Sequence, residues 1–414
     1  MDQRIMLVED AYAAREQTVG RFFETEAPRL AELCHLLARR FAAGGRLVAF
    51  GVGAAATDAQ HVSVEFVHPV IVGKRALPAL ALPNDIPSSM GLAVSDPAGW
   101  LARQLEILGA PGDIALGMVH GSDDPGREPV GVALKEAASA GMLTVYLGDA
   151  GEGAAPGEWS FEVPSDDPFI VQEVHETLYH VLWELVHVFF EHKGLLEGRA
   201  PGRSHDSGRS SFLYPFLAEA ETNIDAVLAE VRRSITQKAA DVIALRGASA
   251  DAVALAEAAR LVAERIAAGG KILAFGNGGS ATDAQDLVGD LVAPPAGVAP
   301  VAAMSLTNDT AVITAVGNDV GFDNTFARQV IAYGGRGDVA VAISTSGGSR
   351  NVLAAVDEAR RRGLLTIGLA GYGGGRLAEL CDLALTVDAD YIPRIQEAQA
   401  SQYHILRSLI GVSA

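Results

Sequence analysis

The sequence is poor in the features that mark secreted, membrane-bound and disulfide-stabilised proteins. It contains only two cysteines in 414 residues. Cys34 and Cys381 lie in different parts of the chain, and we expect both to be reduced core residues of a cytoplasmic protein. The segment after Met1 is acidic and mixed, without a basic start followed by an apolar run, so we expect no signal peptide.

Basic residues are scarce as well. The chain has 32 Lys and Arg against 51 Asp and Glu, a formal net charge of −19. Because sequence-independent nucleic-acid binding depends on clustered cations, we expect no nucleic-acid partner. We find no polybasic run of the kind that binds anionic membranes, and the apolar stretch around Val181 to Phe190 is interrupted by Glu184 and His187 and too short to cross a bilayer. An anionic ligand must therefore be bound locally, by helix N-termini and hydroxyl groups.

The chain is an internal duplication. LVAFGVGAAATDAQ, which begins at Leu47, returns as ILAFGNGGSATDAQ, which begins at Ile272. Landmark pairs keep a nearly constant offset: Gly51 and Gly276, Asp58 and Asp283, Asp113 and Asp338, Gln172 and Gln396, His180 and His404. The sequence therefore predicts two domains, 1–197 and 212–414, joined by a Gly-, Ser- and Arg-rich linker at 198–211.

Each half alternates apolar strands with helices, which predicts an α/β fold. The apolar runs lack polar alternation, so we expect a parallel sheet covered by helices on both faces, with binding sites at the carboxyl ends of its strands. The expected strands include 47–50, 114–119, 143–147, 272–275 and 339–343; helices are expected at 8–23, 27–43, 129–140, 168–191, 250–267 and 393–409.

Two loops of the second half have the composition of a phosphate site. The run 276–280, GNGGS, follows a strand and opens a helix, so its backbone N–H groups can approach an anion. The run 344–349, STSGGS, places four hydroxyls at a second strand-to-helix turn. An ordinary helix start needs only one capping hydroxyl, so we interpret this loop as phosphate-binding.

The first half carries a different set of polar residues. His61 and Glu65 share one helix face, and Gln172 and His180 share a face of another. Together they could hold a divalent metal such as zinc or act as acid and base, although each pair alone is also compatible with a surface feature.

The two halves have lost different things. The second half has Asp286 and Asp290 at the positions of His61 and Glu65. The first half, at 51–55 and 120–126, lacks the hydroxyl-bearing loops of the second. The losses are therefore complementary.

With both halves laid out, the chain resembles the sugar isomerase (SIS) domain family, and within it the phosphoheptose isomerases. The motifs that carry the resemblance are GNGGS at 276–280, GNDVGF at 317–322, STSGGS at 344–349 and RIQEAQASQYH at 394–404. The resemblance implies two tandem SIS domains, each a parallel five-stranded sheet flanked by helices in a flavodoxin-like three-layer sandwich.

The resemblance also implies roles for residues of both halves. Phosphate binding falls on Asn277, Gly278, Gly279, Ser280, Ser344, Thr345, Ser346 and Ser349, and contact with the sugar on Asn318 and Asp319. Zinc ligands fall on His61, Glu65, Gln172 and His180. The equivalent positions of the second half are Asp286, Asp290, Gln396 and His404, an alternative metal set in which Gln396 also counts as substrate-binding. Neither half is a complete copy of the family's site.

The chemistry implied is aldose–ketose isomerisation, most specifically of sedoheptulose 7-phosphate to glycero-manno-heptose 7-phosphate through an enediolate. By resemblance, Glu65 is the base and His180 the acid. Related isomerases often form tetramers, so a duplicated chain is expected to form a homodimer with four SIS domains.

Three hypotheses remain open from the sequence. In the first, a composite pocket takes its phosphate site from the second half and its metal ligands from the first. In the second, the second half acts alone through Asp286, Asp290, Gln396 and His404. In the third, the protein is a non-catalytic phosphosugar-binding or protein-binding module, like the replication-initiator-associating relatives of these isomerases.

Overall fold

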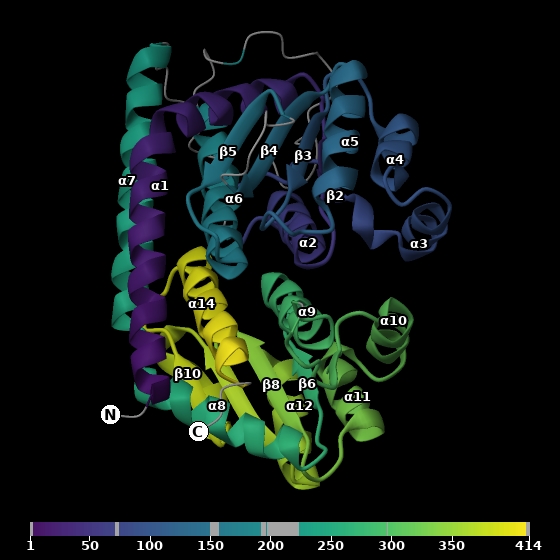
Figure 1. The fold of residues 1–414 in the computed structure, drawn as a ribbon, viewed down its shortest axis with the longest axis vertical. Coiled ribbons are helices and arrows are strands. Elements are labelled where there is room, and N and C mark those ends of the chain that lie inside the picture. Colours follow the sequence, from purple (N-terminus) through teal and green to yellow (C-terminus); the bar gives the residue numbers. More distant parts are fainter. Residues whose placement is uncertain are drawn as a thin grey trace. The chain divides into compact units, whose positions relative to one another are not determined.

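The computed structural model describes residues 3–70, 74–149, 157–191, 196, 223–295 and 297–410 (Figure 1). The chain forms two compact units: an N-terminal unit, Thr18–Ala240, and a C-terminal unit, which joins Met1–Gln17 to Asp241–Ala414. The boundaries between the units fall inside two long helices, α1 (Gln3–Ala42) and α7 (Ile224–Ala248). The predicted linker, 198–211, lies outside the described residues, and the domain bounds 1–197 and 212–414 stay predictions.

The N-terminal unit is built on a parallel sheet of five strands in the order β2-β1-β3-β4-β5. Its strands are β1 (Leu47–Phe50), β2 (Ala79–Ala81), β3 (Ile114–Met118), β4 (Leu143–Asp149) and β5 (Trp159–Val163). Its helices, besides the greater part of α1 and α7, are α2 (Ala54–Val67), α3 (Ile86–Ser95), α4 (Trp100–Leu108), α5 (Arg127–Ser139) and α6 (Pro168–Glu191).

The C-terminal unit repeats this topology, with parallel strands in the order β7-β6-β8-β9-β10. Its strands are β6 (Ile272–Phe275), β7 (Ala303–Ser305), β8 (Val339–Ser344), β9 (Leu365–Ala370) and β10 (Leu383–Thr386). Its helices include α8 (Ala252–Ala267), α9 (Gly279–Val292), α10 (Thr310–Asp319), α11 (Thr325–Tyr333), α12 (Arg350–Arg362), α13 (Gly375–Leu380) and α14 (Ile392–Ile410).

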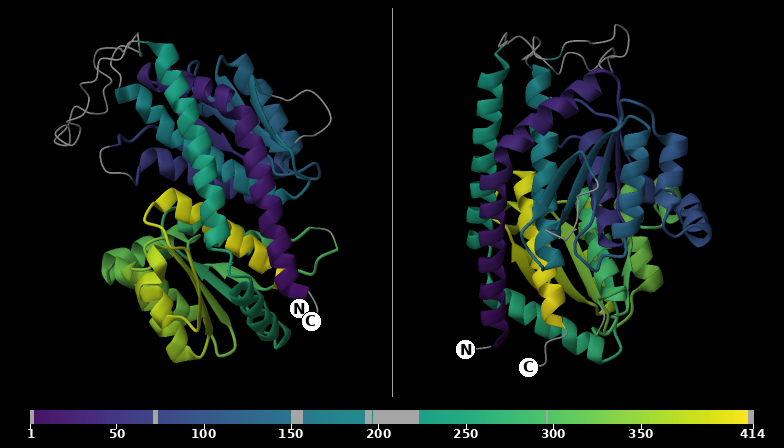
Figure 2. Two further views of the ribbon diagram at one scale, coloured as in Figure 1. Left: turned by 90° about the vertical axis from the view of Figure 1, so that its left-hand side faces the viewer. Right: turned by 45° about the horizontal axis from the view of Figure 1, so that its top comes forward.

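Helices cover both faces of the C-terminal sheet, so the unit is a three-layer sandwich. Side chains of β6 alternate between two cores: Ile272 and Ala274 pack with α8, α9 and α14, whereas Leu273 and Phe275 pack with α11, α12 and α13. The further views in Figure 2 show the helical layers on either side of each sheet. The expected fold class, a parallel five-stranded sheet flanked by helices in each repeat, is confirmed.

The strand order reverses direction between β6 and β8. From β6 the chain moves to β7 on one side, and it then returns to β8 on the other side. In an open parallel sheet, this switch point is where ligands bind, at the carboxyl ends of the strands. The register pairs Phe275 with Ala342, so the loops after β6 and β8 lie at the same edge.

The start of the chain differs from the prediction. We expected two helices, 8–23 and 27–43, but α1 is one helix of 40 residues with Pro28 inside it. A proline within a helix costs about 3 kcal/mol. Buried apolar residues continue on both sides of it, among them Phe23, Ala27 and Leu30, and their packing outweighs that cost. In the part of the chain that the structure describes, no helix is both long and apolar enough to span a membrane.

Equivalent aspartates, Asp338 and Asp113, accept backbone hydrogen bonds beside the first residues of the central strands in the two units. The carboxylate of Asp338 accepts hydrogen bonds from the backbone N–H groups of Lys271 and Gly335 and from Lys271 Nζ at 2.6 Å. Asp113 does the same for Arg46 and Ala110 in the N-terminal unit. Burial disfavours the charged form of Asp338, but the hydrogen bonds from Lys271 and Gly335 outweigh this and lower its pKa.

We therefore expect Asp338→Asn to reduce the free energy of unfolding by about 1–3 kcal/mol at neutral pH. Because the folded-state pKa is depressed, the stabilisation is present above the ordinary carboxyl pKa and disappears as the pH falls through the folded value. The loss should therefore shrink in acid. Urea unfolding at neutral and at acidic pH measures this loss of stability. Asp323→Asn, which removes an exposed ion pair to Arg350, is the control. Equal losses in the two variants would contradict this role.

Candidate functional site

The loop after β6 is tied to the start of α12. Gly278 adopts a φ of +56°, a conformation that favours glycine, and it begins the turn into α9. Asn277 and Asn351 exchange two side-chain hydrogen bonds of 2.9 and 2.8 Å. Ser280 is buried at the first turn of α9. The loop 276–280, which we call the cradle, is therefore tied by side-chain hydrogen bonds to the helix that follows the loop after β8.

The loop after β8 is a cluster of hydroxyls. Ser344 Oγ lies 3.2 Å from Ser349 Oγ and 3.5 Å from Ser346 Oγ. Ser349 stands at the N-cap position of α12, yet its side chain makes no capping hydrogen bond. The serines are thus arranged around one another rather than around the helix end, which supports the phosphate-binding interpretation over a simple cap.

The remaining residues predicted to contact substrate in this unit are more open. Thr345 is half-buried in the same loop. Asn318 and Asp319 end α10, are exposed, and share a hydrogen bond of 2.7 Å. Their assignment to the sugar stays a prediction.

The matching loops of the N-terminal unit have a similar backbone conformation but lack the side chains proposed to bind phosphate. Gly53 has a φ of +62°, like Gly278, but Ala55 replaces the hydroxyl of Ser280. In the loop after β3, the carboxylate of Asp124 accepts hydrogen bonds from the backbone N–H groups of His120 and Gly126, at 2.8 and 2.7 Å. An anionic side chain of the protein thus already uses donors that a phosphate would need.

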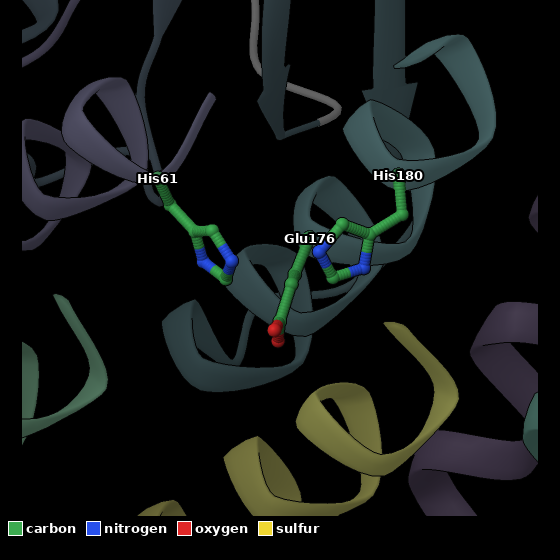
Figure 3. A group of neighbouring side chains, drawn as sticks. All are labelled: His61, Glu176 and His180. Atoms are coloured by element: carbon green, nitrogen blue, oxygen red, sulfur yellow. The ribbon is translucent and has the colours of Figure 1, made fainter. Parts of the chain in front are cut away.

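Two helices of the N-terminal unit bring a buried polar cluster together. His61 on α2 and Glu176 and His180 on α6 each offer a ligand atom within 4.8 Å of the others, and all three are buried. Figure 3 shows the three side chains converging from the two helices. Tyr179 Oη lies 2.9 Å from His61 Nδ1, a contact that orients this imidazole.

Burial sets the proton affinities in this cluster. It lowers the pKa of His61 well below its ordinary value, and the charge of His180 acts in the same direction. Burial also raises the pKa of Glu65, against the effect of His180 and with that of Glu184. Glu65 Oε1 lies 3.8 Å from His61 Nε2, and its Oε2 is buried with no hydrogen-bond partner among the described residues. This donor set of imidazole nitrogens and carboxylate oxygens suits a divalent metal.

The structure thus places His61 beside both Glu65 and His180, and it gives Gln172 a hydrogen-bond partner on α2. Gln172 Nε2 donates to Asp58 Oδ1 at 3.5 Å, and Asp58 also lies 2.6 Å from His120 Nε2. Our sequence reasoning missed Glu176. Its position four residues before His180 on one helix face was a signal that could have found it.

The C-terminal unit has a second cluster of potential ligands. Asp286 and Asp290 on α9 and His404 on α14 have ligand atoms within 4.8 Å of one another. His404 Nε2 and Tyr403 Oη lie 3.1 and 2.9 Å from the same oxygen of Asp286, so this carboxylate already has two partners within the protein. Gln396 is buried on α14.

Comparison with known proteins places the chain in a family. The SIS domain matches residues 12–146 and 233–371, so the protein belongs to the SIS domain family and carries this domain twice.

Individual relatives resemble one domain at a time. The chain is 48% identical to the phosphoheptose isomerase of Rhodospirillum rubrum over 179 residues, 43% of this chain and 94% of that protein. It is also 48% identical to the phosphoheptose isomerase of Desulfovibrio desulfuricans, over 38% of this chain and 76% of that protein.

Solved structures of low sequence identity share the whole two-domain fold. The C-terminal domain of glucosamine-fructose-6-phosphate aminotransferase from Francisella tularensis is 10% identical and has a TM-score of 0.57 over 99% of this chain and 96% of that one. Tagatose-6-phosphate ketose/aldose isomerase from Escherichia coli is 13% identical, with a TM-score of 0.55 over 98% and 92%. These likenesses concern the fold alone.

The paired asparagines generate a prediction about the phosphate loops. Asn351→Ala removes both side-chain hydrogen bonds to Asn277. The loop 276–280 would then lose conformational freedom only when an anion binds, which weakens binding. We expect the affinity for inorganic phosphate, measured by calorimetry, to fall about tenfold. Asn324→Ala, which removes an amide bonded to Val320 O outside these loops, is the matched control. An unchanged affinity in Asn351→Ala would contradict the proposal that the Asn277–Asn351 pair holds the loop for phosphate binding.

Proposed function

We propose that the protein is a phosphosugar isomerase that converts sedoheptulose 7-phosphate to glycero-manno-heptose 7-phosphate through an enediolate. The observation that carries the proposal is the buried group of His61, Glu65, Glu176 and His180, an acid–base and ligand set in a chain whose other half keeps a loop of clustered hydroxyls. The identity of 48% to two phosphoheptose isomerases supports the choice of sugar.

In this proposal, the C-terminal unit binds the phosphoryl end of the substrate. Hydroxyls of Ser344, Ser346 and Ser349 and the backbone of the loop before α9 are neutral donors, and the N-termini of α9 and α12 favour negative charge. A phosphate dianion is thereby bound without a lysine or arginine in the loop.

The N-terminal unit moves the protons. Glu65 removes a proton from the carbon next to the carbonyl and returns one to the former carbonyl carbon. His180 acts as the acid at the sugar oxygens. The raised pKa of Glu65 brings its proton affinity closer to that required of a base working near neutral pH.

A divalent metal, zinc by family resemblance, fits the same residues. His61, Glu65, His180 and Glu176 would hold it, with Gln172 nearby. When bound, zinc would stabilise negative charge on the oxygens of the sugar.

The two repeats thus divide the work on one substrate. The complementary losses support this division, because each repeat lacks what the other retains. The second candidate assigns metal and acid–base roles to Asp286, Asp290, Gln396 and His404. The hydrogen bonds that Asp286 receives within the protein favour the first candidate. We also propose a cytoplasmic homodimer, which would assemble four SIS domains.

Turnover tests the proposed reaction. With sedoheptulose 7-phosphate as substrate, we expect NMR to show the anomeric proton of an aldose 7-phosphate. Glu65→Gln should lower kcat at least about a hundredfold, because it removes the base. Glu24→Gln, an exposed glutamate of the same unit, should not. Binding of the sugar phosphate without turnover in the wild type would favour the non-catalytic alternative instead.

Metal analysis tests the division between the repeats. We expect the purified protein to contain about one zinc per chain, held by the single proposed site. His61→Ala should lose most of the zinc, because it removes an imidazole ligand, whereas Asp290→Asn should retain it. Unchanged zinc in His61→Ala, with loss in Asp290→Asn, would move the site to the C-terminal unit.

A further inference from the structure

The C-terminal unit has a cavity at the edge of its sheet opposite to the phosphate loops. Its volume is about 610 Å³, a size typical of small-molecule sites. The backbone from Gly363 to Leu365, which enters β9, forms part of its wall. The phosphate loop lies instead at the other end of the neighbouring strand, after Ser344.

Arginines dominate the charge of this cavity, which we call the arginine cavity. Arg265 from α8 and Arg360 and Arg361 from α12 line it, together with Asp357 and Asp382. One oxygen of Asp382 already accepts hydrogen bonds from the backbone N–H and hydroxyl of Thr366, both at 2.9 Å.

Two of these arginines lie in the last turns of their helices and have no acidic partner side chain among the described residues. Arg361 pairs with Glu358. Among the residues that the structure describes, the side chains of Arg265 and Arg360 form neither an ion pair nor a hydrogen bond. Other arginines of the same helices, such as Arg260 and Arg362, are paired with glutamates. In a chain with a net charge of −19, two unpaired arginines facing one cavity suggest a bound anion.

The duplicated domain supplies an internal comparison. Aligning the sequence GMLT at 141–144 with GLLT at 363–366 places Ala138, Ser139 and Ala140 opposite Arg360, Arg361 and Arg362. The fold of this turn therefore needs no cation, because the same turn forms in the N-terminal unit without one. Arg360 and Arg361 are therefore a property of the second repeat, whereas Arg265 has a counterpart, Arg40, before the Gly-Gly turn of the first repeat.

We propose that the arginine cavity binds a small phosphorylated metabolite, at a site separate from the one that holds the substrate. Planar guanidinium groups bind phosphoryl oxygens in pairs, which explains why arginine rather than lysine lines the cavity. A volume of about 610 Å³ suits a phosphate monoester or a short polyphosphate.

Helix α12 connects this cavity with the proposed substrate site. Ser349, at the N-cap of α12, belongs to the hydroxyl loop, and Arg360 and Arg361 lie in its last turn. The helix has 13 residues, so the two ends are about 20 Å apart. An anion in the cavity thus contacts the same rigid element that positions the phosphate loop, which makes it a candidate effector.

Calorimetry with inorganic pyrophosphate tests the proposal. The full chain carrying Ser344→Ala and Ser349→Ala is the reference, since its hydroxyl loop no longer contributes. Adding Arg265→Gln and Arg360→Gln should weaken pyrophosphate binding at least about tenfold, because two charged donors are lost. Adding Arg260→Gln and Arg376→Gln instead removes the same charge from exposed, paired positions and should change the Kd by less than about twofold.

Three results would overturn the proposal: no pyrophosphate binding to the reference protein, equal binding by both quadruple variants, or equal weakening in both. Thermal unfolding shows whether the arginine variant is folded. If it is not, Arg360→Lys alone keeps the charge but loses the planar fork, and should still bind several-fold more weakly. Glycerol 2-phosphate in place of pyrophosphate distinguishes the sources: tighter binding of pyrophosphate indicates a polyphosphate, and equal binding indicates a monoester.

Discussion

The reversal of strand order in each parallel sheet is the constraint on which the candidate site depends. Because β7 and β8 flank β6 on opposite sides, the loops after β6 and β8 leave the sheet next to each other, and each leads into the N-terminus of a helix. Two helix N-termini and a set of hydroxyls then lie at the same edge of the sheet. We propose that this strongly acidic protein binds a phosphate in this way, without a basic loop.

The N-terminal unit shows how the same frame serves another purpose. The turn at Gly53 keeps the backbone of the cradle, but Asp124 satisfies the donors of the following loop from within the chain. The candidate functional side chains of this unit lie instead on α2 and α6, where His61, Glu176 and His180 are buried close to one another. Burying several ionisable groups is costly unless they bind something or pair, which is why we assign a function to this cluster.

Much of the fold could be predicted, because strands and repeats leave local signals. The apolar runs at 47–50 and 272–275 are strands as expected, and the duplication predicted the second sheet from the first. The continuity of α1 could not be predicted, because packing beyond Pro28 decides it. Pairwise spacing located His61 and His180, but the approach of Glu176 to His61 and the hydrogen bond from Gln172 to Asp58 depend on the packing of α6 against α2. The arginine cavity is lined by residues of α8 and α12, which are far apart in sequence, so no local sequence pattern could predict it.

Anomalous diffraction at the zinc edge, from crystals soaked with zinc and a non-reactive sugar phosphate, tests the division of labour most directly. We predict a zinc peak among His61, Glu65 and His180 and phosphate density on the loop from Ser344 to Ser349. Zinc between Asp286 and His404, or phosphate on the loop that contains Asp124, would contradict it.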